Sequence, residues 1–130
     1  MSKIIWGDID KSSAREVMLL AATFEVVMKR GIRVTINVYE YPNGKFMPIS
    51  SHSFWGPTQI GAYDSSPFTD SIELALNSAI EGLTAFDRDE FSNEEVFYVK
   101  EDENDDIGLR YFDGNGYEVS HEEFLRRRKK

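Results

Sequence analysis

The feature that most constrains the fold is a strict alternation of apolar and polar residues over residues 32–39. The even-numbered positions are Ile or Val, and the odd-numbered positions are Arg, Thr, Asn and Tyr. This period of two is typical of a strand with one buried face. Tyr-Pro-Asn-Gly-Lys follows at residues 41–45, where proline presets φ and Asn-Gly accepts positive φ. The chain is therefore expected to reverse there and to continue as a second extended run over residues 46–55.

A helix that can cover these strands is predicted from Ser66 onward. Ser66 and Pro67 are typical residues for an N-cap and a first helical position. Apolar residues then recur at helical spacing, at Phe68, Ile72, Ala75, Leu76, Ala79, Ile80 and Leu83. A sheet with one apolar face needs such a stripe packed against it.

Another helix is predicted nearer the N-terminus, over residues 14–30. Ser13 and Glu16 have the spacing of a capping box, and Gly31 is a suitable residue to end the helix. Apolar residues cover most of its circumference, which indicates either deep burial or a second apolar face for a partner. A short strand is expected before it at residues 3–6. The order helix, three strands, helix over residues 13–86, with the third strand at 58–63, is similar to that of double-stranded-RNA-binding domains.

The C-terminal part predicts two more strands and a short helix. Strands are expected at residues 94–100 and 107–112, with turns at 101–106 and 113–116. Ser120 and Glu123 form a second capping box, so a helix should run to about Arg128. The basic residues 126–130 are expected to fray. The prediction is a single α+β domain over residues 1–130: an antiparallel sheet with two main helices on one face, a C-terminal β-hairpin and a short terminal helix.

The amino-acid composition excludes several kinds of site and classes of protein. A chain of 130 residues with 41% hydrophobic residues can bury a core as one domain. Cysteine is absent, which excludes thiol nucleophiles, disulfides and Cys-type zinc sites. No apolar run resembles a signal peptide or approaches the length of a membrane span, so a cytoplasmic protein is expected.

The net charge of −8 is unevenly distributed along the chain. Residues 51–125 contain eighteen Asp and Glu but three Lys and Arg, whereas the last five residues are all basic. Such an acidic surface repels nucleic acid and attracts basic surfaces. The candidate partner-binding residues are Asp87, Asp89, Glu90, Glu94 and Glu95, followed by Glu101, Asp102, Glu103, Asp105 and Asp106.

A cation site at the second acidic cluster is a weaker alternative. Asp102, Asn104, Asp106 and Asp113 have the first three and the twelfth spacings of a calcium loop. Ile107 occupies the sixth position, where the sharp turn needs glycine. A solvated hairpin tip is therefore the preferred interpretation, and no metal or cofactor is predicted.

An enzyme is not predicted. His52 lies between serines, but no serine has the Gly-x-Ser-x-Gly spacing of a nucleophile elbow, and His121 is the only other histidine. Nucleic-acid binding could use Lys29, Arg30, Arg33 and the basic C-terminus, with exposed tyrosines at Tyr39 and Tyr41. However, residues 66–73 contain no Lys or Arg, where double-stranded-RNA-binding domains carry basic residues.

The sequence therefore predicts a small acidic, non-enzymatic protein-binding module whose partner has a basic surface. A bacterial or phage inhibitor that covers a nucleic-acid-handling surface is one such protein. The alternatives are a nucleic-acid-binding module that uses the basic patch near Arg30 and Arg33, and an acidic globule with no dedicated partner. The sequence gives no prediction of the oligomeric state.

Overall fold

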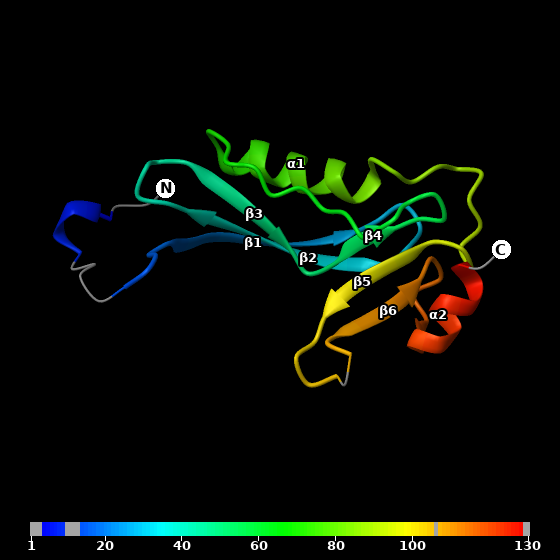
Figure 1. The fold of residues 1–130 in the computed structure, drawn as a ribbon. Coiled ribbons are helices and arrows are strands. Elements are labelled where there is room, and N and C mark those ends of the chain that lie inside the picture. The colour runs from blue at the N-terminus through cyan, green and yellow to red at the C-terminus, as the bar shows by residue number, and fades with distance from the viewer. Residues whose placement is uncertain (1–3, 10–13, 106, 129–130) are drawn as a thin grey trace.

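The computed structural model describes residues 4–9, 14–105 and 107–128, and it confirms an α+β fold with antiparallel sheets. One sheet has the strand order β1 (Leu19–Val27), β2 (Arg33–Glu40), β3 (Phe46–Ser50). The other has the order β4 (Ser53–Trp55), β5 (Phe97–Glu101), β6 (Leu109–Asp113), β7 (Glu118–Val119). The helices are a short 3-10 helix η1 (Trp6–Asp8), α1 (Ile72–Thr84) and α2 (His121–Arg128) (Figure 1).

The hairpin of β2 and β3 forms as the sequence predicts. Gly44 adopts a φ of 79° and donates its backbone N–H to the carbonyl of Tyr41 at 2.9 Å, which closes the turn. On the face of β2 that points toward α1, Val34, Ile36 and Val38 are at most 1% exposed. The alternating pattern thus buries one face of β2 beneath α1, which packs mainly on β3 and β2.

The helix predicted over residues 14–30 is wrong, because this segment contains β1. Exposure alternates along the strand: Thr23, Glu25 and Val27 are exposed, whereas Phe24 and Val26 are half-buried. Phe24 lies opposite Ile36 in the register with β2. Pairing with a neighbouring strand outweighs the helix propensity of the Leu and Ala residues, so the segment forms a strand.

Two consequences follow for the N-terminal region. The predicted strand at residues 3–6 is wrong where the structure describes it, because Trp6 begins η1; Lys3 and Ser13 lie outside the described residues. The order helix, three strands, helix that is similar to double-stranded-RNA-binding domains is not formed, since its first helix is a strand.

α1 begins later than predicted. Ser71, not Ser66, caps the helix, and its Oγ accepts the backbone N–H of Leu74 at 3.1 Å. The segment before it is extended, and Thr69 forms a two-way backbone bridge with Phe46. The strand predicted over residues 58–63 is also wrong: Tyr63 makes an isolated bridge to Phe54 within a connection otherwise without regular structure.

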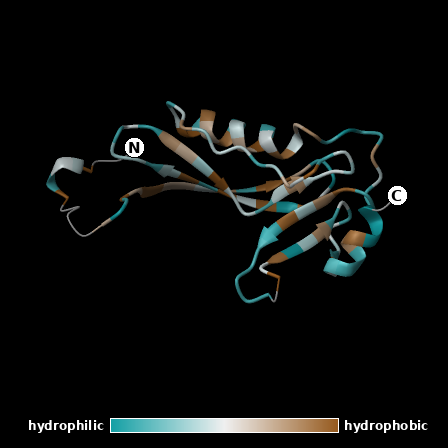
Figure 2. Cartoon of the chain, in the orientation of Figure 1, coloured by the Kyte–Doolittle hydropathy of each residue, from teal (hydrophilic) through white to brown (hydrophobic). Residues whose placement is uncertain are grey.

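The two sheets share one hydrophobic core. β3 and β4 are separated by two residues, Ser51 and His52, so the chain passes directly from one sheet to the other. Ile36 of the first sheet and Phe54 and Tyr98 of the second belong to a single buried cluster that also contains α1 residues. A smaller cluster centred on Phe124 attaches α2 to the outer side of the second sheet. Figure 2 shows hydrophilic residues through most of the β5–β6 turn and over much of α2.

Gly82 fixes the approach of α1 to the preceding segment. A Cβ atom at this position would lie 2.5 Å from the backbone nitrogen of Ser65. Gly82→Ala is therefore expected to destabilise the protein by about 1–3 kcal/mol through overpacking, although alanine is the better helix former. Urea denaturation measures the difference. Asn77→Ala, at an exposed position of the same helix, is the control and should not destabilise; equal stability of Gly82→Ala would contradict the close packing.

Candidate functional site

Asp87, the first of the predicted binding residues, belongs to an internal ion pair. Its two carboxylate oxygens accept hydrogen bonds from Nε and Nη2 of Arg30 at 2.9 and 2.7 Å. The side chains of Arg30 and Asp87 are only 12% and 19% exposed. Arg30 also donates to Oδ1 of Asn93 at 2.6 Å and to the carbonyl of Phe91 at 3.1 Å. The hydrogen bond with Asp87 raises the pKa of Arg30, although burial opposes it, so Asp87 holds the β1–β2 turn against the segment after α1.

Asp89 and Glu90 are both on the surface but differ in their partners. Asp89 accepts a hydrogen bond from Nζ of Lys29 at 2.9 Å, and this bond lowers the pKa of Asp89. Both side chains of this pair are more than four-fifths exposed. Glu90 is exposed and forms no ion pair with another described residue. Glu90 therefore contributes a full negative charge to the surface.

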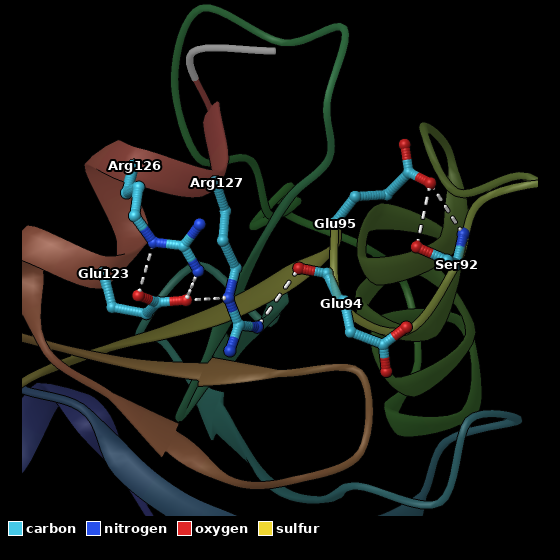
Figure 3. A pocket seen from close by; sticks show the side chains of 6 residues that line it. All are labelled: Ser92, Glu94, Glu95, Glu123, Arg126 and Arg127. Carbon is cyan, nitrogen blue, oxygen red and sulfur yellow. Dashed lines mark hydrogen bonds and ion pairs between the residues drawn. The ribbon is translucent and has the colours of Figure 1, made fainter.

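Glu94 and Glu95 line a small pocket beside α2 rather than an anionic patch. The pocket has a volume of about 270 Å³, and its walls are Ser92, Glu94, Glu95, Glu123, Arg126 and Arg127 (Figure 3). Glu95 accepts hydrogen bonds from the backbone N–H and the hydroxyl of Ser92, both at 2.9 Å.

The two arginines of this pocket form hydrogen bonds to its glutamates. Hydrogen bonds from Arg126 and then Arg127 lower the pKa of Glu123 to about 2. Arg127 also donates to the backbone carbonyl of Glu94 at 3.2 Å (Figure 3). Both arginines form ion pairs with Glu123, and Arg127 also pairs with Asp113. The pocket therefore combines two arginines with three glutamates.

Among the predicted sites, the acidic turn between β5 and β6 contains the most exposed carboxylates that form no ion pair with a described residue. Glu101, Glu103 and Asp105 are exposed, and none forms an ion pair with another described residue. Asp102 is half-buried, 3.7 Å from Nη1 of Arg110, and its Oδ1 accepts the N–H of Asn104. The turn extends beyond the ends of its strands, away from the rest of the chain (Figure 1). Asp106, also predicted here, lies outside the described residues.

The basic residues expected to bind nucleic acid are mostly engaged within the protein. Besides Arg30, Arg127 lies 3.1 Å from Asp113, a carboxylate that is 3% exposed. Arg128 donates to the carbonyl of Gly56 at 3.1 Å and lies 4.8 Å from the centre of the Trp55 ring. Arg126–Arg128 complete α2, whereas Lys129 and Lys130 lie outside the described residues, so the fraying expected from residue 126 stays a prediction.

Asp113 is not part of a calcium loop. It lies at the end of β6 opposite Phe97, whereas the acidic turn adjoins the other end of that strand. Its carboxylate accepts the backbone N–H groups of Asn115 and Tyr117, at 3.0 and 3.2 Å, in addition to the contact with Arg127. Nowhere in the described part of the chain do three or more His, Asp or Glu side chains gather to hold a metal ion.

Ser51 and His52 form a hydrogen-bonded pair at the junction of the sheets. Oγ of Ser51 accepts the N–H of Thr35 at 2.9 Å and is hydrogen-bonded to Nδ1 of His52 at 2.7 Å. Burial, and then the charges of Lys100 and Arg110, lower the pKa of His52 to about 4. The ring is consequently neutral at pH 7. Asp64, which lines the adjoining pocket, accepts a hydrogen bond from the hydroxyl of Ser53 at 2.6 Å.

No described helix combines the length and the apolar composition needed to cross a bilayer. Comparison of the chain with protein-family models, with characterised proteins and with solved structures found no match.

Proposed function

We propose that this protein is a non-enzymatic binding module that uses the β5–β6 turn to bind a basic surface of another protein. The observation that carries the proposal is the set of three exposed carboxylates, Glu101 at the end of β5 and Glu103 and Asp105 on the projecting turn, none of which forms an ion pair with a described residue. Uncompensated charge on a projection attracts oppositely charged partners and accelerates their association.

The distribution of the cations supports this choice over nucleic-acid binding. Arg30, Arg127 and Arg128 donate their hydrogen bonds to carboxylates and carbonyls of the protein itself. Arg33 remains exposed on β2, and Lys29 and Arg126 are exposed but paired with Asp89 and Glu123, so these cations do not make the basic stripe that phosphates require. Direct binding to DNA or RNA is therefore the less supported function.

The chemistry of the turn also suggests the class of partner. Closely spaced carboxylates present a negative surface comparable to that of successive phosphates, so a surface that handles nucleic acid would accept them. An inhibitor of a bacterial or phage nucleic-acid-binding protein would have this property. The proposal needs no catalytic group, in keeping with a neutral His52 that no described carboxylate orients.

Reversing the charges of the turn tests the proposal. The variant Glu101→Lys/Glu103→Lys/Asp105→Lys should associate with immobilised polylysine about tenfold more slowly than the wild type, with a flatter salt dependence. The matched control is Asp8→Lys/Glu73→Lys/Glu81→Lys, which makes the same change in net charge at exposed acids elsewhere. Surface plasmon resonance at several ionic strengths measures the association rates.

Equal losses in the two variants would mean that total charge, not the turn, governs binding. Salt-independent association would point to an apolar interface instead. The wild-type protein should also fail to bind duplex DNA or RNA at physiological salt. Tight, salt-sensitive binding to a duplex would favour the nucleic-acid alternative.

A further inference from the structure

We propose that β1 pairs antiparallel, along its free edge, with β1 of a second copy of this chain. The two three-stranded sheets would then become one continuous sheet. The inference starts from the edges of the sheets, because an unpaired strand edge offers N–H and C=O groups to another strand.

β1 is the least protected of the four edge strands. β3 contains Pro48, and its outer edge is bridged by Thr69 at Phe46. β4 has three residues and is bridged by Tyr63, and β7 has two residues. β1 is nine residues long, contains no proline or lysine, and pairs with no described strand except β2.

The side chains of β1 are also incompletely covered. Leu20 and Val27 are 50% and 60% exposed on one face of the strand. On the other face Phe24 and Val26 are only half-buried, because α1 packs mainly on β3 and β2. A strand added outside β1 would cover apolar surface on both faces.

The backbone alternation identifies the groups available for pairing. The N–H of Met28 donates to the carbonyl of Ile32 at 2.8 Å, so Met28 directs its backbone groups toward β2. Alternate residues of an antiparallel strand direct these groups to opposite sides. The backbone groups of Thr23, Glu25 and Val27 therefore face the free edge. The bulge between Leu20 and Ala22 marks the end of this regular edge.

A two-fold axis through Phe24 makes this edge complementary to itself. In that register Phe24 lies opposite Phe24 of the second copy, and Glu25 lies opposite Thr23. The hydroxyl of Thr23 donates to Oδ1 of Asn37 at 2.9 Å within the chain, and by rotating away from it could donate to the carboxylate of Glu25 of the second copy, as Thr35 does within one chain at 2.6 Å. No like charges face each other directly, and the aromatic pair adds a favourable cross-strand contact. Because the edge is complementary to itself, the partner that fits it is a second copy of this chain.

The salt dependence of association distinguishes this dimer from the proposed binding of a basic partner. Each copy carries a net charge of −8, so repulsion opposes the dimer and screening should strengthen it. Binding of a basic partner by the β5–β6 turn should instead weaken with salt. Each proposal can therefore fail without the other.

Sedimentation equilibrium from micromolar to millimolar concentration tests the dimer. The wild type should dimerise, more tightly at higher salt. Glu25→Pro removes an outward N–H and leaves the backbone hydrogen bonds to β2 in place, although the side-chain bond from Thr35 is lost. This variant should be monomeric with an unchanged far-ultraviolet circular dichroism spectrum. Glu25→Gln is the matched control: it removes the charge but keeps the N–H, and should remain dimeric. A monomeric wild type at every concentration, or a dimeric and folded Glu25→Pro, would overturn the proposal.

Disulfide trapping tests the register, since the chain contains no cysteine of its own. A mixture of Thr23→Cys and Glu25→Cys proteins should form a mixed disulfide under mild oxidation, because directly opposite Cα atoms are about 5.5 Å apart. Each variant alone should react more slowly, since its thiols would be diagonal neighbours about 7–8 Å apart. Equal rates in the mixture and in the single variants would overturn the Phe24-centred pairing.

Discussion

Replacing Arg30 with methionine is expected to lower the free energy of unfolding by on the order of 3–5 kcal/mol. The substitution keeps a long apolar stem but leaves the carboxylate of Asp87 shielded from solvent without its cation. It also removes the donors to Asn93 and to the carbonyl of Phe91. Urea denaturation of the two proteins, compared at equal salt, measures the loss.

The neighbouring residue supplies a matched control. Lys29→Met makes the same change in charge in the same turn, but the pair of Lys29 and Asp89 is fully on the surface, so little stability should be lost. Similar losses in the two variants would show that Arg30 contributes only surface charge. A double variant with Asp87→Asn should recover part of the loss, because it removes the uncompensated carboxylate.

Stability should fall in mild acid because of His52, which is 8% exposed. The pKa of His52 is lowered from 6.5 to about 4 in the folded protein, chiefly by burial. As the pH falls below 6.5 the unfolded chain takes up the proton first, so folding loses stability progressively until the pH reaches about 4. Since each pKa unit corresponds to about 1.4 kcal/mol, the loss amounts to about 3 kcal/mol. Urea midpoints at pH 7 and pH 4 measure it.

His52→Asn isolates this contribution from the titration of the carboxylates. An asparagine oxygen can accept the Ser51 hydroxyl but does not gain a proton in this pH range. The difference in stability between pH 7 and pH 4 should therefore shrink by about 3 kcal/mol in the variant. An unchanged difference would mean that the folded protein tolerates a charged His52.

The parts of the fold that were predictable from sequence have strong local signals. The alternation in β2 and the Asn-Gly turn predicted the β2–β3 hairpin, and Ser120 marked the start of α2 correctly. β1 was mistaken for a helix because Leu and Ala obscure the alternation of Thr23, Glu25 and Val27 with buried positions. Its strand conformation depends on pairing with β2, and the local sequence pattern gives no information about that pairing.

For the candidate site, the sequence predicted only which region carries the negative charge. The sequence located the acidic turn, and Glu101 and Glu103 are exposed there. It gave no sign that Asp87 is bound by Arg30, because 57 positions separate the two residues. The same holds for Arg127 and Asp113, whose contact depends on the packing of α2 on the second sheet. Composition predicts charge, but the tertiary fold determines which charges remain available.

The passage of the chain from β3 into β4 has a consequence for folding kinetics. β1, β2 and β3 pair as successive hairpins, whereas β4 pairs with β5, placing Ser53 opposite Val99. Closing so long a loop lowers the folding rate, since its entropy is lost before the contacts form. During synthesis the first sheet can therefore form early, while Phe54 stays without Tyr98 until β5 has left the ribosome. The shared core is therefore completed only after the second sheet has paired.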